Sequence, residues 1–144
     1  MSLKYLYEVG FIFRGFIIIS HDFKMLPIKA SSEKKDLRGA FIAAINTFAE
    51  TAFNNNSLEY LDSGKILFIF KINKIKSRDY KKEEPIIMYG LVDKTKKNPD
   101  KIVRKFMEKS ELIFQKFITQ YYDKDFTNLT LFEPFENELK DYFL

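Results

Sequence analysis

The chain has 144 residues, 46% of them hydrophobic, and it contains no cysteine. That length suits one domain with one core, the hydrophobic content excludes a disordered chain, and the lack of cysteine excludes disulfides, thiol nucleophiles and thiolate metal sites. The net charge of +4 conceals a basic middle, because residues 71–105 hold twelve Lys and Arg against five Asp and Glu.

The first half of the chain predicts a β-hairpin followed by a helix. Aromatic and β-branched residues dominate from Tyr5 to Ile19, and Arg14-Gly15 within this run suits a tight turn. A single long bent strand is the alternative. Pro27 prevents helix in the connector that follows, and apolar residues at a helical period then predict a helix over 37–53.

Three strands are predicted next, joined by a turn and a charged loop. They cover Leu58–Leu61, Lys65–Ile72 and Ile86–Val92. The second strand is apolar at every position from Ile66 to Phe70, which indicates burial on both faces. The short connections favour an antiparallel meander.

Two helices are predicted to complete the chain. Asn98, Pro99 and Asp100 stand in the order of an N-cap, a first-turn proline and an acid near the positive end of the helix dipole. A long helix is therefore expected from here to about Tyr122, and a short one over Pro134–Leu144. We expect a single domain over residues 1–144, an α/β (α+β) three-layer sandwich around a five-stranded, mostly antiparallel sheet.

The order strand-strand-helix-strand-strand-strand-helix-helix resembles the longin domain, a module of vesicle-trafficking proteins and small-GTPase regulators. The longin-like domains abundant in certain archaea are the nearest resemblance. It is carried by the opening strand with Arg14-Gly15, by DLRGAFIAAINTFA at 36–49 and by YGLVDK at 89–94. The resemblance spans approximately residues 5–122 and implies a non-enzymatic protein-interaction module, an adaptor or regulator of small GTPases or of membrane traffic.

The helix predicted over 37–53 offers a candidate partner surface. Its apolar positions cover an arc of about 220°, wider than packing on a sheet requires. The residues of the flank that remains are Arg38, Ile42, Asn46, Ala49 and Phe53. The resemblance implies a homodimer or a protein partner such as a small GTPase here, because longins commonly use their first helix and its neighbouring strand. Alternatively, the preceding connector or the terminal helix covers this flank.

The basic middle is the second candidate surface. The residues that we expect to face an anionic surface are Lys74, Lys76, Arg78, Lys81 and Lys82. Each lysine near an acidic leaflet contributes about 1 kcal/mol, so peripheral contact of a cytoplasmic protein with a membrane is one interpretation. Nucleic-acid binding through residues 71–105 is the alternative function, although Tyr80 is the only aromatic well placed to stack on bases. A solvated charged hairpin is the plainest interpretation.

Residues of catalytic type are few and scattered. His21 is the only histidine. It is followed by Asp22, but no further histidine or cysteine is present to complete a metal site around this pair. The five glycines fit no phosphate-binding spacing, and Glu83-Glu84 lies in a charged loop where carboxylates are usually solvated. We therefore expect no enzymatic activity, no metal and no cofactor.

Overall fold

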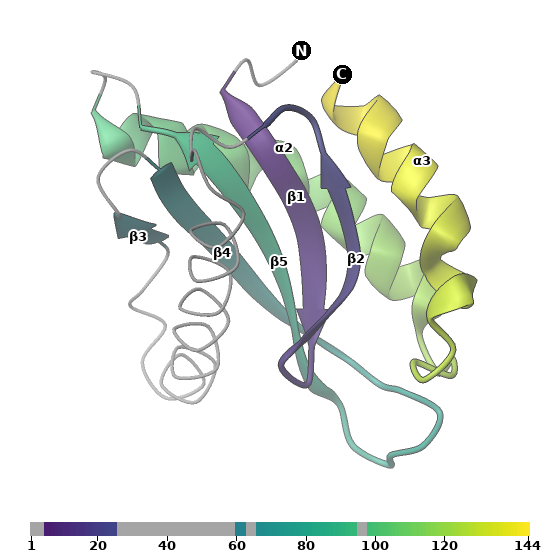
Figure 1. Cartoon of the computed structure of the whole chain (residues 1–144). Helices are drawn as coiled ribbons and strands as arrows, with labels where there is room; N and C mark the ends of the chain where they lie inside the picture. The colour runs from purple at the N-terminus through teal and green to yellow at the C-terminus, as the bar shows by residue number, and fades with distance from the viewer. Residues whose placement is uncertain (1–4, 26–59, 63–65, 95–97) are drawn as a thin grey trace.

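The computed structural model of the chain describes residues 5–25, 60–62, 66–94 and 98–144 (Figure 1). The strands are β1 (Leu6–Phe13), β2 (Phe16–Asp22), β3 (Tyr60–Asp62), β4 (Ile66–Ile75) and β5 (Glu84–Asp93). They are followed by α2 (Pro99–Tyr121), the 3-10 helix η1 (Leu129–Phe132) and α3 (Glu133–Phe143). The helix predicted over 37–53 lies outside the described residues.

The five strands form one sheet in the order β2-β1-β5-β4-β3, and every neighbouring pair is antiparallel. The expectation of a mixed, mostly antiparallel sheet is therefore corrected to an antiparallel one. The reason is that the longest connection between strands, from β2 to β3, joins the two edges of the sheet. A crossover between adjacent strands is what would have made a parallel pair. The predicted meander of β3, β4 and β5 is confirmed.

The predicted turn at Arg14-Gly15 is confirmed, and the single bent strand is excluded. Both residues have positive φ, 52° and 80°, as in the two-residue turns whose twist matches that of a hairpin. Phe13 pairs with Phe16 directly across the turn. Strand β2 continues to Asp22, further than predicted, because it remains paired with β1 along its whole length.

Strand β4 is buried on both faces at its apolar centre, as predicted. All five side chains of Ile66–Phe70 are buried, and they alternate between two clusters. Leu67 and Ile69 pack in the cluster that includes α2 and α3, whereas Phe68 and Phe70 belong to a second cluster on the opposite face. This arrangement leaves almost no polar side chain in the middle of the sheet.

Contacts between aromatic rings, some stacked and some edge-on, hold α2 and α3 against the same face of the sheet (Figure 1). The Phe11 ring of β1 lies 4.2 Å from Phe117 of α2, and Phe117 lies 5.2 Å from Phe135 of α3, measured between ring centroids. The predicted N-cap is confirmed, since the Asn98 side chain accepts a hydrogen bond from the backbone N–H of Asp100. In the described part of the chain, no helix is long and apolar enough to span a bilayer.

Gly90 lets α2 come close to β5. A Cβ atom at this position would lie 2.5 Å from the ring of Phe106, far inside van der Waals contact. The absence of a side chain on β5 thus makes room for a large aromatic on the helix.

Replacing Phe68 by Ala should lower the free energy of unfolding by about 3–5 kcal/mol, because the ring fills space in a packed core. Urea unfolding followed by circular dichroism measures this change. Phe16→Ala is the matched control, since that ring is 74% exposed and its loss should cost under about 0.5 kcal/mol. Equal urea midpoints for the two variants would contradict the position of β4.

Gly90→Ala should destabilise the domain by about 1–3 kcal/mol, the usual cost of overpacking. If the cause is the Phe106 ring, the same change made in a Phe106→Leu background should cost much less. Thermal melts of the two single variants and the double variant test this double-mutant cycle. Additive effects would show that Gly90 is required for another reason.

Candidate functional site

Three segments far apart in the sequence meet at one end of the sheet (Figure 1). They are the β1–β2 turn, the β4–β5 loop and the linker that follows α2, and we call residues 14–16, 76–83 and 122–129 together the loop end. Backbone contacts join the loop to the linker, where Ser77 bridges to Lys124. The N–H of Arg78 donates to the Lys124 carbonyl at 2.8 Å, and that of Asp123 donates to the Lys76 carbonyl at 2.7 Å.

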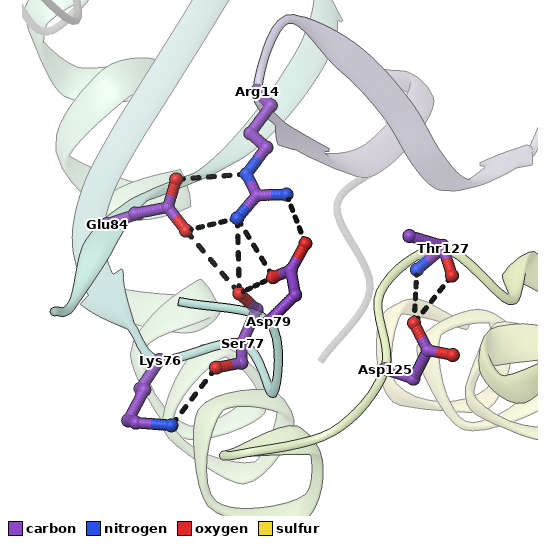
Figure 2. Close-up of polar contacts among 7 residues, drawn as sticks. All are labelled: Arg14, Lys76, Ser77, Asp79, Glu84, Asp125 and Thr127. Carbon is purple, nitrogen blue, oxygen red and sulfur yellow. Dashed lines mark hydrogen bonds and ion pairs between the residues drawn. The ribbon is translucent and has the colours of Figure 1, made fainter. Parts of the chain in front are cut away.

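Arg14 clamps the turn to the β4–β5 loop (Figure 2). Its Nε and Nη2 donate to the two carboxylate oxygens of Glu84 at 2.9 and 2.7 Å. Its Nη1 and Nη2 donate to those of Asp79, both at 3.0 Å, and Nη2 also reaches the hydroxyl of Ser77 at 3.2 Å. Paired bonds of this kind between guanidinium and carboxylate are strong and directional. Every nitrogen of the guanidinium is therefore engaged within the protein.

The electrostatics of this cluster fit a structural role. Hydrogen bonds from Arg14 and then Ser77 lower the pKa of Asp79 to about 2. Hydrogen bonds to Glu84 and Asp79 raise the pKa of Arg14 above its usual range. Ser77 is fully buried, and its hydroxyl donates to Asp79 at 2.5 Å. The expectation that Glu83 and Glu84 are simply solvated is wrong for Glu84, whose side chain is only 20% exposed because it binds Arg14.

The predicted anionic-surface residues lie at or beside the loop end. Lys76 forms an ion pair with Asp123 at 2.6 Å, and its hydrogen bond lowers the pKa of that carboxyl. Arg78, Lys81 and Lys82 are exposed and form no ion pair with any described residue. Lys74 is exposed near the end of β4.

The other basic residues of 71–105 that the structure describes lie away from the loop end. Lys94 pairs with Asp62 at 2.6 Å at the far end of β5, a strand of ten residues that extends about 33 Å. Lys71 projects from the middle of β4, where it donates to the Met107 carbonyl and pairs with Glu111. Basic residues that are close in the sequence are thus separated along the strands of the sheet.

Two of the three exposed apolar side chains at the loop end, Phe16 and Leu129, were not singled out from the sequence, whereas Tyr80 was considered there as a base-stacking residue. Phe16 is 74% exposed, Tyr80 48% and Leu129 53%. Phe16 had been counted simply as the first residue of an apolar strand. The exposure of Phe16 could have been anticipated, because the first residue of an edge strand, directly after a tight turn, has few neighbours to cover its side chain.

A groove of about 790 Å³ lies on the helix side of the sheet, between β3, β4 and α2. Its lining residues are Tyr60, Lys71, Asp100, Val103, Arg104, Met107, Glu108 and Glu111. The Tyr60 hydroxyl donates to Asp100 at 3.2 Å, and the hydrogen bond from Lys71 lowers the pKa of Glu111. Several of its polar groups are therefore already paired with each other. No local sequence pattern indicates this groove, because it depends on how α2 lies against β3.

His21 lies on β2 and faces α3 rather than forming a site with Asp22. Its Nδ1 is 3.4 Å from Glu136, and its ring lies edge-on to Phe23 at 4.8 Å. Within the described ranges, no group of three or more His, Cys, Asp or Glu side chains is arranged to hold a metal ion. The partner-binding candidates Arg38, Ile42, Asn46, Ala49 and Phe53 lie outside those ranges.

Comparisons with known proteins identify no family for this chain. No family model, curated protein or solved structure matches it. What is established is an antiparallel five-stranded sheet with two C-terminal helices on one face.

The Arg14 clamp predicts a specific dependence of stability on pH. The pKa of Asp79 falls from 3.8 to about 2 on folding, so its ion pair stabilises the fold above pH 4 and this contribution is lost as the pH falls toward 2. Arg14→Asn removes the clamp and keeps a residue that tolerates positive φ. Urea midpoints of parent and variant should differ at pH 7 and converge between pH 4 and 2. A difference that stays constant over that range would contradict the ion pair.

Proposed function

We propose that this chain is a longin-like protein-interaction domain without catalytic activity, an adaptor or regulator of small GTPases or of membrane traffic. The supporting observation is the order of the elements: a hairpin, a three-stranded meander and two helices around one antiparallel sheet. That order is the one that the longin resemblance implies for this part of the chain. The Arg14 cluster is consistent with a non-catalytic domain, because its polar groups bind one another and hold the loops together.

The partner surface in this proposal is the flank of the helix predicted over 37–53. The sheet face opposite α2 and α3 carries buried apolar side chains such as Phe68 and Phe70. A helix whose apolar stripe packs on that face would leave Ile42 and Phe53 on its flank. Burying each of them against a partner would contribute about 1.5–3 kcal/mol before the costs of association.

The test compares the parent with Ile42→Glu and with the control Leu112→Glu, which places the same charge on a side chain that is 74% exposed on α2. Self-association by light scattering, and affinity for purified small GTPases in both nucleotide states, are the two readouts. The Ile42 variant should bind at least about tenfold more weakly, with an unchanged circular dichroism spectrum, while the control behaves like the parent.

Two outcomes would contradict the proposal. One is a parent protein that stays monomeric and binds no small GTPase in either state. The other is equal loss of binding in the Ile42 and Leu112 variants, which would reflect added charge rather than a surface on the predicted helix.

A further inference from the structure

The loop end presents large apolar side chains from three separate segments. Phe16 comes from the β1–β2 turn, Tyr80 from the β4–β5 loop and Leu129 from η1, and all three are substantially exposed. The Arg14 clamp holds the turn to the loop, and the Ser77–Lys124 bridge holds the loop to the linker before η1. Phe126 of that linker also packs on Phe13, 4.7 Å between ring centroids. The three segments that carry these side chains are therefore held together at one end of the sheet.

The same segments also carry exposed cations. Four of them are exposed and form no ion pair with any described residue: Arg78, Lys81, Lys82 and Lys124.

Most carboxylates of the same region bind neighbouring side chains, and the exposed Glu83 accepts a hydrogen bond from the Tyr122 hydroxyl at 3.2 Å. Asp79 and Glu84 bind Arg14, and Asp123 binds Lys76. Asp125 accepts hydrogen bonds from the backbone N–H and the hydroxyl of Thr127, at 3.0 and 2.6 Å (Figure 2). The loop end holds six Lys and Arg against four Asp and Glu, so its net charge is positive.

We propose that the loop end binds the surface of an acidic lipid bilayer, with Phe16, Tyr80 and Leu129 entering the interfacial layer. The exposed lysines and arginine contact the anionic headgroups in this arrangement. Aromatic side chains favour the headgroup region, and each lysine held near an acidic leaflet strengthens binding about fivefold. Stable attachment to a membrane generally takes two weak signals together, and this surface combines an apolar one with a cationic one.

The same features fit nucleic acid less well. Single strands are bound by aromatic rings that follow a continuous basic groove. Lys71 instead lies on β4 and Lys94 at the far end of the sheet. Lys101, Arg104 and Lys105 lie in the first turns of α2. Apolar Leu129 has no place in such a groove. The proposal does not rest on the GTPase partner or on the predicted helix, because all of its residues lie in the described part of the chain.

The first experiment is co-sedimentation of the full chain with vesicles of phosphatidylcholine alone, or with about one third phosphatidylserine. Binding should require the anionic lipid and should weaken strongly between about 0.1 M and about 1 M salt. Lys81→Glu/Lys82→Glu should reduce binding about 30-fold, and Phe16→Ser about tenfold.

The matched control is Lys101→Glu/Lys105→Glu, which makes the same change in net charge on exposed residues of α2. These two lysines lie in the first turns of a helix of 23 residues, about 30 Å and about 24 Å from its loop-end terminus. Their reversal should change vesicle binding less than threefold, since screening weakens charges at these distances. Equal losses in the two double variants would overturn the proposal in favour of nonspecific attraction by net charge.

The second experiment uses tryptophan as a reporter, because the chain contains none. Phe16→Trp should show a blue-shifted emission with acidic vesicles and quenching by lipid-borne quenchers. Leu112→Trp is the control, since both native side chains are 74% exposed. A shift of equal size in the two variants, or none at Phe16→Trp, would overturn insertion at the loop end.

Oligonucleotides complete the test. Fluorescently labelled single-stranded and duplex DNA and RNA should bind the parent much more weakly than acidic vesicles at the same salt concentration. Tight binding that Lys81→Glu/Lys82→Glu abolishes and Phe16→Ser leaves unchanged would overturn the proposal and identify a nucleic-acid surface. Loss of GTPase binding in Ile42→Glu with vesicle binding intact would separate this proposal from the preceding one.

Discussion

Burial of the central strands on both faces is the constraint that organises this domain. β1 has no exposed residue, and β4 and β5 are buried through most of their length. Few charged side chains can be accommodated there, because an unpaired buried charge is costly. Glu8 and Lys71 are the exceptions, and each has a partner: the Tyr89 hydroxyl donates to Glu8, and Lys71 pairs with Glu111. Most charge is therefore confined to the loops, the strand ends and the outer faces of the helices.

The loop end is a direct consequence of that confinement. A hairpin, a meander and a long helix all reverse direction at this end, so their polar turns collect there. Arg14 then orders them, because a side chain at the tightest turn reaches two carboxylates of the next loop. Lys81 and Lys82 of that loop are exposed, as is Phe16 of the turn. The membrane surface that we propose would thus use the side chains that a sheet buried on both faces leaves at its end.

The sequence predicted the elements well and their assembly only in part. The period of apolar residues located α2, and the unbroken run Ile66–Phe70 correctly indicated a strand with two buried faces. Local chemistry also identified the Arg14-Gly15 turn. Contacts between distant segments leave no such local pattern, so the Arg14 clamp and the groove beside Tyr60 were missed. The division of the lysines between the two ends of the sheet was missed for the same reason, since it depends on strand direction.

The membrane surface that we propose requires three distant segments to meet acidic lipid together. Hydrogen–deuterium exchange of the whole chain, with and without phosphatidylserine vesicles, tests it in one measurement. Lipid should slow exchange in residues 13–17, 76–83 and 123–129 together and leave the first turns of α2 unchanged. Protection centred on residues 99–105, or protection of one of the three segments without the others, would contradict it.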